Sequence, residues 1–212
     1  MKISKLQYIT VSPAHAEEAC KGGVDWIQLR VKNKNEDEWK LIALEAKKIC
    51  KARGAKLIIN DSVKLAKIVG ADGVHLGKED MPPDEARKLL GPDFIIGGTA
   101  NTIEDIQRLA LLKVDYIGLG PFRFTNTKKN LSPLLGIQGY IDLMKECEAE
   151  SIKVPIIAIG GIQMEDVDAI LETGIYGIAV SSAIGDSANI SEAASEFIGK
   201  IKNLRGYEKQ RI

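Results

Sequence analysis

Short apolar runs alternate with amphipathic segments along the whole chain. The runs hold four to six residues each and are bounded by polar or turn residues. Such runs are typical of parallel strands that are covered by helices on their outer face. We therefore predict eight strands, at Leu6–Val11, Trp26–Arg30, Lys56–Ile59, Gly73–Leu76, Phe94–Gly97, Tyr116–Leu119, Pro155–Ile159 and Gly177–Val180.

The segments between these runs have helical spacing. In the second segment the apolar residues between Trp39 and Ile49 recur at intervals of three and four, which forms one stripe. Thr102 suits a helix N-cap, and Gly54 and Gly91 stand where helix C-caps belong. The predicted helices are Ala14–Lys21, Glu36–Arg53, Val63–Ile68, Pro83–Leu90, Ile103–Leu112, Ile137–Glu150, Met164–Thr173 and Ile190–Asn203.

A weak internal repeat groups the strands in pairs. The segments GGVDWIQLR, VGADGVHLG, LKVDYIGLG and ETGIYGIAV begin at residues 22, 69, 112 and 172, so the last interval is the widest. The other strands, KLIIND, DFIIGGT and VPIIAIGG, also resemble one another. Repeated βαβα units predict an α/β fold, a (β/α)₈ TIM barrel. The alternative is a doubly wound open sheet, but the first strand ends in ITVSPAH without a glycine-rich turn.

Length and composition favour a single-domain protein without a nucleic-acid partner. The 212 residues are 45% hydrophobic and carry no net charge, which predicts one domain over residues 1–212 and no nucleic-acid partner. The polar tail 205–212 is expected to fray. The chain shows no signal peptide and no apolar run long enough to span a membrane, so we expect a cytoplasmic protein without membrane contact. Its three separated cysteines are expected to be reduced thiols.

The functional residues of a TIM barrel lie at the C-terminal ends of its strands. The second strand ends in Gln28, Arg30 and Lys32, which alternate and so share one face. Two cations and an amide on one face suit a polyanion. The alternative is a solvated edge, although an inward-facing arginine needs a partner.

Carboxylates follow the next two strands. Asn60 and Asp61 end the third strand, and Asp80 lies in the loop after the fourth. Two carboxylates beside a polyanion site suit one Mg²⁺ ion, and the alternative is that each caps the helix that follows it. His75 ends the fourth strand as a general base or, without a Ser or Cys partner, as a structural residue.

A second anion site is expected on the opposite strands. Gly161 follows the seventh strand, and Ser181 and Ser182 follow the eighth, as in the phosphate site of many barrels. After the sixth strand, DYIGLGPFRFTNTKK (115–129) enters a loop with hydroxyls and adjacent lysines that suits an anion. Gly118 and Gly120 in this segment let the backbone approach a ligand.

Seven motifs, in order and in spacing, closely resemble the thiamine phosphate synthase (thiamine-phosphate pyrophosphorylase) family. They are QLRVK, IINDS, GVHLGKED, GGTANT, GLGPFRFTNTKK, AIGGI and AVSSAI, and the resemblance runs from about Leu6 to Leu204. It implies a TIM barrel transferase of thiamine biosynthesis that joins a hydroxymethylpyrimidine diphosphate to a thiazole phosphate. The diphosphate leaves first, and the thiazole nitrogen captures the pyrimidine-methyl cation.

The resemblance also implies roles for individual residues, with Arg30, Lys32 and Lys128 as the catalytic cations. Asp61 and Asp80 would hold Mg²⁺. The pyrimidine diphosphate would be bound by Gln28, Leu29, Arg30, Val31, Lys32, Asn60, Thr99 and Lys128. The thiazole phosphate would be bound by Thr125, Asn126, Thr127, Gly161, Ser181 and Ser182.

The chain departs from the family pattern at a few positions. Ser62 replaces a second Asp, Thr99 a Ser and Asn101 a His, while Phe122–Phe124 replaces a stiffer proline-containing segment. The alternatives are a thiazole tautomerase on the same fold, which tends to lack these carboxylates, and a non-catalytic sensor of phosphate ligands. Closure of the loop 121–130 over substrate is a hypothesis, and assembly into a homo-oligomer is left open.

Overall fold

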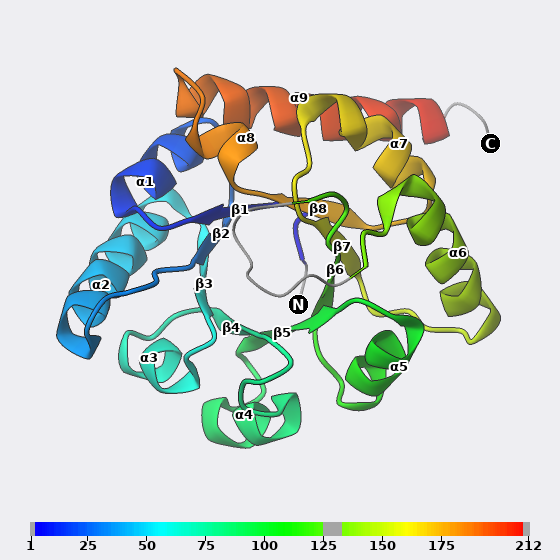
Figure 1. Cartoon of the computed structure of the whole chain (residues 1–212). Helices are drawn as coiled ribbons and strands as arrows, with labels where there is room; N and C mark the ends of the chain where they lie inside the picture. Colours follow the sequence, from blue (N-terminus) through cyan, green and yellow to red (C-terminus); the bar gives the residue numbers. More distant parts are fainter. Residues whose placement is uncertain (1–2, 125–132, 210–212) are drawn as a thin grey trace.

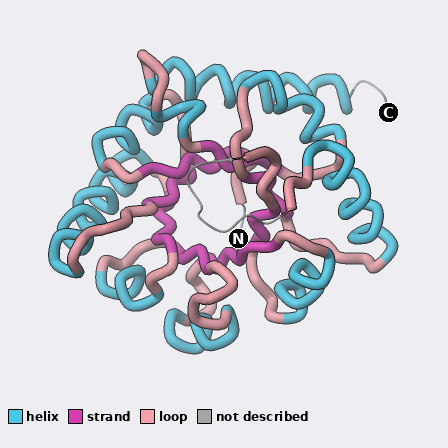
Figure 2. The backbone as a smooth tube through the Cα atoms, in the orientation of Figure 1, coloured by secondary structure: helices cyan, strands magenta, loops and turns pink. Residues whose placement is uncertain are grey.

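A closed barrel of parallel strands forms the centre of the molecule, in a computed structural model that describes residues 3–124 and 133–209, the side chains of 204–209 excepted. Each strand pairs with its neighbours in sequence, and β1 pairs with β8 to close the ring (Figures 1 and 2). The strands are β1 Leu6–Thr10, β2 Trp26–Leu29, β3 Lys56–Asn60, β4 Gly73–Leu76, β5 Ile95–Ala100, β6 Tyr116–Leu119, β7 Ile156–Ile159 and β8 Gly177–Val180.

Helices surround the ring and bury its outer face (Figure 2). They are α1 Pro13–Lys21, α2 Glu36–Arg53, α3 Val63–Ile68, α4 Pro83–Leu90, α5 Ile103–Leu111, α6 Gly136–Ala149, the 3₁₀ turn η1 Met164–Asp166, α7 Val167–Glu172, α8 Ser182–Gly185 and α9 Ile190–Lys209. The predicted TIM barrel is confirmed. None of the described helices is long and apolar enough to cross a membrane.

Helix ends follow the predicted caps. The Thr102 hydroxyl accepts a hydrogen bond from the Asp105 amide, and the Asp105 carboxylate accepts one from the Thr102 amide. This pair of bonds is a capping box. Gly54 ends α2 with a left-handed φ of 69°, a conformation that costs glycine little. Helix α9 runs six residues past the predicted end, so the tail from Arg205 is helical as far as Lys209.

The fifth strand differs most from its prediction. The sequence pattern predicts an end at Gly97, yet β5 continues through Gly98 and Thr99 to Ala100. The space that the glycines leave is filled, because the Tyr116 ring lies against Gly97 and the Leu109 side chain against Gly98. Tertiary packing therefore overrides the weak strand preference of glycine.

The repeated aspartates of the sequence have a common structural role. Asp72 accepts a hydrogen bond from the Leu57 amide at 2.8 Å, and Asp115 accepts one from the Ile96 amide at 2.7 Å. Each aspartate thus joins the start of an even-numbered strand to the strand before it. Because these bonds lie at the N-terminal ends of the strands, they serve the stability of the barrel.

Candidate active site at the C-terminal ends of the strands

The interior of the barrel changes from apolar to polar along the strands. Side chains of a strand alternate between the interior and the helices, so residues two apart share a face. In β2 the inward position after Trp26 is Gln28, and in β3 the position after Ile58 is Asn60. The apolar cluster of the interior is formed by Ile3, Ile9, Trp26, Ile58, Ile95, Tyr116, Ile157 and Ala179.

Five residues that are predicted to bind the pyrimidine diphosphate lie at the polar, C-terminal end of the barrel interior. Gln28 and Asn60 are buried, whereas Arg30 is partly exposed just beyond the end of β2. Lys32 is exposed, and Thr99 is partly exposed near the end of β5. Their strands place all five at the C-terminal end of the barrel, where a substrate has access.

Leu29 and Val31 alternate out of this face. The Leu29 side chain is fully buried among the helix-facing residues of the core, and Val31 packs against the same cluster. A substrate contact by either residue would therefore use its backbone. The side chains of Leu29 and Val31 themselves pack against the helices.

Two carboxylates and two cations lie together at the mouth of the barrel. The pKa of Asp61 is raised to about 6, mainly by burial and in addition by the adjacent Asp80 carboxylate. Arg30 and Lys32 are near enough to lower the pKa of Asp61 in part. The arrangement gathers residues from three loops around one point.

Neither aspartate caps a helix, which contradicts that alternative. Ser62 caps α3 by accepting a hydrogen bond from the Leu65 amide at 3.2 Å. Asp61, one residue earlier, has a left-handed φ of 64° that is uncommon for any residue but glycine. Asp80 accepts a hydrogen bond from the Gly77 amide at 2.6 Å, and α4 begins without a side-chain cap. Both carboxylates are thus oriented by loops and not by helix ends.

The Mg²⁺ prediction can be compared with this donor set. Within residues 3–124 and 133–209, no three Asp, Glu, His or Cys side chains gather as a metal cluster. Mg²⁺ commonly takes only one or two carboxylates and completes its shell with water and phosphate oxygens. The Asp61–Asp80 pair fits that requirement.

The second predicted anion site lies around β7 and β8. Gly160 and Gly161 turn the chain with φ of 104° and 68°, and Ser181 and Ser182 are exposed at the start of α8. The turn is held by Arg123, whose guanidinium donates to the Gly161 carbonyl at 3.3 Å. A short helix after β8 agrees with the predicted phosphate site.

The loop after β6 is anchored at its base. Arg123 forms an ion pair with Asp166 at 2.6 Å, and its amide donates to the Gly160 carbonyl at 3.1 Å. The Phe122 ring stacks on Tyr140 with centroids 5.7 Å apart. The segment that departs from the family pattern is therefore fixed to the barrel. The predicted Thr125, Asn126, Thr127 and Lys128 lie outside the described residues, as does Lys129.

His75 is a member of a buried hydrogen-bond chain. Its ring nitrogens lie 3.0 Å from the Tyr116 hydroxyl and 3.0 Å from the Thr99 hydroxyl. The space beside Gly118 is occupied by His75, so this glycine makes room for a side chain and not for a ligand. Sequence reasoning missed Gln7 and Tyr116, although a glutamine at an inward position of β1 is a signal that could have been used.

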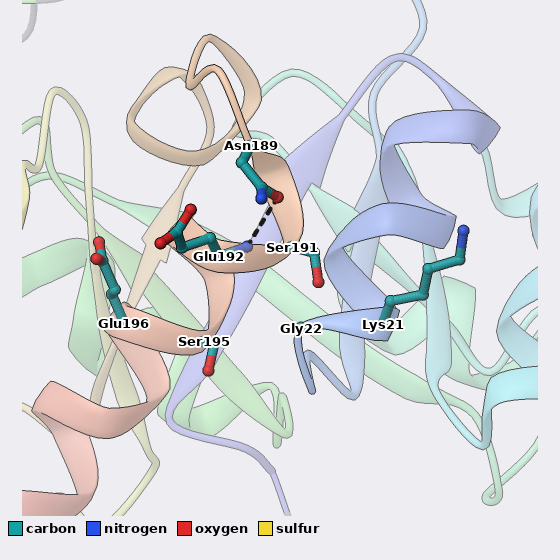
Figure 3. A pocket seen from close by; sticks show the side chains of 7 residues that line it. All are labelled: Lys21, Gly22, Asn189, Ser191, Glu192, Ser195 and Glu196. Atoms are coloured by element: carbon teal, nitrogen blue, oxygen red, sulfur yellow. Dashed lines mark hydrogen bonds between the residues drawn. The ribbon is translucent and has the colours of Figure 1, made fainter.

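A separate hollow of about 450 Å³ lies between the end of α1 and the start of α9 (Figure 3). Figure 3 shows Asn189 capping α9 by accepting a hydrogen bond from the Glu192 amide, and Glu196 lies one turn further along. Its charged lining mixes Lys21 with two glutamates. None of the predicted site residues that the structure describes lines this hollow, so it is distinct from the described part of the barrel mouth.

Comparison with known proteins agrees with this geometry. A thiamine-phosphate synthase of Bacteroides fragilis is 54% identical over 169 residues, which cover 80% of this chain and 83% of that protein. One of Flavobacterium psychrophilum is 48% identical over 204 residues, which cover 93% and 99%. The solved structure of a thiamine phosphate pyrophosphorylase from Pyrococcus furiosus superposes with a TM-score of 0.83 at 30% identity, over 94% of this chain and 96% of that one.

The family itself is identified by its sequence profile. The profile described as thiamine monophosphate synthase matches residues 5–184, which is most of the chain. The match covers every strand of the barrel and reaches into the short helix α8. The resemblance seen in the sequence is thereby confirmed, and the chain belongs to the thiamine monophosphate synthase family.

Proposed function

We propose that this chain is a thiamine-phosphate synthase. It would join 4-amino-2-methyl-5-(diphosphooxymethyl)pyrimidine to a thiazole phosphate, giving thiamine phosphate and diphosphate. Family membership supports the reaction class. The observation that carries the assignment is the meeting of Arg30 and Lys32 with the Asp61–Asp80 pair at the mouth of the barrel.

Arg30, Lys32 and the two carboxylates form a receptor for a charged leaving group. Arg30 and Lys32 would bind the diphosphate of the pyrimidine substrate, with Lys128 as a third cation in the predicted set. Two carboxylates beside this site would repel a diphosphate unless a cation lay between them. Asp61 and Asp80 would hold Mg²⁺, which would neutralise negative charge on the diphosphate.

The thiazole phosphate would occupy the other half of the mouth. Gly161, Ser181 and Ser182 offer backbone amides and hydroxyls there, and the predicted set adds Thr125, Asn126 and Thr127. Arg123 would support this half because its guanidinium donates to the Gly161 carbonyl and so holds the glycine turn in place. The two substrates would then meet above the polar layer of the interior.

The proposed chemistry needs no protein nucleophile. The bond between the methylene carbon and the diphosphate oxygen breaks, and its electron pair leaves with the diphosphate. The lone pair of the thiazole nitrogen then forms the new carbon–nitrogen bond. The negative charge on the departing diphosphate is larger in the transition state than in the substrate. Arg30 and Lys32 would therefore bind the transition state more tightly than the substrate.

Diphosphate release tests the proposal directly. Purified protein is mixed with both substrates and Mg²⁺, and diphosphate is measured with time. Release that requires both substrates is the expected result. Binding of both ligands without any release would overturn the assignment and favour a phosphate-ligand sensor.

Arg30 can be tested with a matched surface arginine. Arg30→Ala is expected to lower turnover by about 10²-fold or more, since it removes a charge that stabilises the leaving group. The control is Arg53→Ala, because Arg53 forms an exposed ion pair with Glu17 on the helix layer. Equal activity of the two variants would contradict the role of Arg30.

The metal role of Asp80 has a separate test. Asp80→Ala is expected to lower turnover far more than binding of the thiazole phosphate, and to raise the Mg²⁺ concentration for half-maximal rate by about tenfold or more. Asp84→Ala, at an exposed residue of α4, is the matched control. Equal losses of turnover and thiazole binding in Asp80→Ala would count against a metal ligand.

Asn60, Asp61 and Asp80 favour the synthase over a tautomerase on the same fold, which has no use for a diphosphate site. All three are present at the mouth of the barrel. We place the reaction in the cytoplasm, and the free thiols of Cys20, Cys50 and Cys147 support a reducing compartment.

A further inference from the structure

A chain of four hydrogen bonds crosses the interior of the barrel. Gln28 Nε2 donates to Gln7 Oε1 at 3.0 Å, and Gln7 Nε2 donates to the Tyr116 hydroxyl at 3.3 Å. The Tyr116 hydroxyl lies 3.0 Å from His75 Nδ1, and His75 Nε2 lies 3.0 Å from Thr99 Oγ1. The chain thus runs through β2, β1, β6, β4 and β5. It joins two residues of the proposed pyrimidine site, one at each end.

The orientation of the Gln7 amide gives this chain a direction. The Tyr116 hydroxyl accepts from Gln7 and is also a hydrogen-bond partner of Gln28, and we assign its own proton to His75 Nδ1, 3.0 Å away. An accepting Nδ1 leaves the imidazole proton on Nε2, which must then donate to Thr99 Oγ1. The proton of the Thr99 hydroxyl is thereby left for a partner outside the chain.

The surroundings hold the chain in place. Gln7, Gln28 and Tyr116 are no more than 2% exposed, and burial raises the pKa of Tyr116, so its hydroxyl keeps its proton. The Trp26 ring meets the Tyr116 ring edge-on at 4.8 Å. Rings and amides packed in this way have little freedom to rotate, which preserves the direction of the bonds.

Among the five residues of this hydrogen-bond chain, Thr99 has the hydroxyl proton that no other member accepts. Thr99 is partly exposed at the mouth of the barrel. We propose that His75 is a positioning residue that, with Tyr116 and Gln7 behind it, presents the Thr99 hydroxyl as a hydrogen-bond donor to an acceptor atom of the pyrimidine diphosphate. The identity of this ligand rests on the proposed function. The direction of the chain does not, because it belongs to the protein without substrate.

The first test measures the tautomer of His75. The protein has two histidines, and His15 is exposed on α1, so His15→Gln leaves only the His75 imidazole to observe. ¹⁵N NMR of the ligand-free protein is expected to show a protonated Nε2 and an accepting Nδ1. A protonated Nδ1 would mean that both amides are turned over and that the chain runs the other way, which would overturn the proposal.

The second test measures substrate use. Thr99→Val removes the hydroxyl at nearly constant volume and is expected to raise KM for the pyrimidine diphosphate about tenfold, with KM for the thiazole phosphate unchanged. Thr99→Ser restores a hydroxyl and is expected to recover most of that loss. Tyr116→Phe is expected to raise the same KM by a smaller factor.

The double variant separates positioning from mere packing. If Tyr116 acts through Thr99, Tyr116→Phe adds little to KM in the Thr99→Val background. Independent losses that multiply would overturn the positioning role. If Tyr116→Phe does not fold, the Thr99→Val and Thr99→Ser pair and the NMR spectrum still decide the matter.

Failure of this inference can be told from failure of the proposed function. If the wild-type protein releases no diphosphate while His75 carries its proton on Nε2, the function fails and the chain direction stands. If the protein turns over but KM for the pyrimidine substrate is unchanged in Thr99→Val, the positioning role is wrong and the function stands.

Discussion

A methyl group on Gly97 would overlap the ring of Tyr116, its direct partner on the neighbouring strand β6. This relationship explains why a glycine stands inside a central strand. The ring needs the space to reach the interior, where its hydroxyl meets Gln7 and His75. Tyr116 therefore takes part both in the apolar packing of the barrel interior and in its hydrogen-bond chain.

Gly97→Ala is expected to destabilise the fold by about 1–3 kcal/mol, because an extra methyl group in a packed interior forces its neighbours to move. Equilibrium unfolding in urea measures the loss. The control is Gly199→Ala on α9, where a methyl group meets nothing within 4 Å and is expected to be neutral or slightly stabilising. Equal stability of the two variants would show that Tyr116 shifts freely.

Asp115→Ala should weaken the barrel without affecting its chemistry. Asp115 pairs with Arg87 at 2.6 Å and accepts from the Ile96 amide, so its loss removes the carboxylate partner of Arg87 and leaves the Ile96 amide without this acceptor. We expect a loss of about 1–2 kcal/mol in the free energy of unfolding, and unchanged KM values. Asp84→Ala, which breaks only an exposed pair with Lys88, should cost about 0.5 kcal/mol or less. A changed KM in Asp115→Ala would contradict this division of roles.

Arg123→Ala should act on one substrate only. The side chain connects the loop base to Asp166 and to the Gly161 carbonyl, and its loss frees the glycine turn. Steady-state kinetics should show KM for the thiazole phosphate raised about three- to tenfold, since a hydrogen bond to a charged group is worth about 1.5 kcal/mol or somewhat less when exposed. KM for the pyrimidine diphosphate should not change. The same increase in both KM values, or an equal effect from Arg53→Ala, would argue against it.

Asp61 should make the metal-free protein less stable above pH 6. Its pKa is raised to about 6 in the folded state, so the folded protein takes up this proton before the unfolded chain does. The destabilisation is therefore fully present above that pH and is relieved as the pH falls through about 6 toward 4. Asp61→Asn should raise stability at pH 7.5, by about 1 kcal/mol or less because the carboxylate is only partly buried and solvent screens its charge.

Thermal unfolding of Asp61→Asn and wild type at pH 7.5 and pH 4.5, both without divalent metal, would measure this effect. The difference should shrink at the lower pH. A difference that is constant with pH would mean that Asp61 titrates normally in the folded protein.

Much of the site followed from strand ends and alternation. The alternation of side chains along a strand predicts that Gln28 and Asn60 face inward, and the barrel brings both to the same end. Alternation also explains why Leu29 and Val31, adopted from the family resemblance, turn their side chains toward the helices. Family motifs mark a segment, whereas the strand geometry decides which of its side chains reach the ligand.

The pattern of apolar and polar residues by itself determined the order of strands and helices, because periodicity is set by local geometry. It did not determine which residues meet across the barrel. The Gln7–Tyr116 contact joins positions 109 residues apart, and the length of β5 depends on a ring from β6. Only the closed sheet decides such contacts, since closure brings distant strands into one interior and leaves each buried polar group to find a partner there.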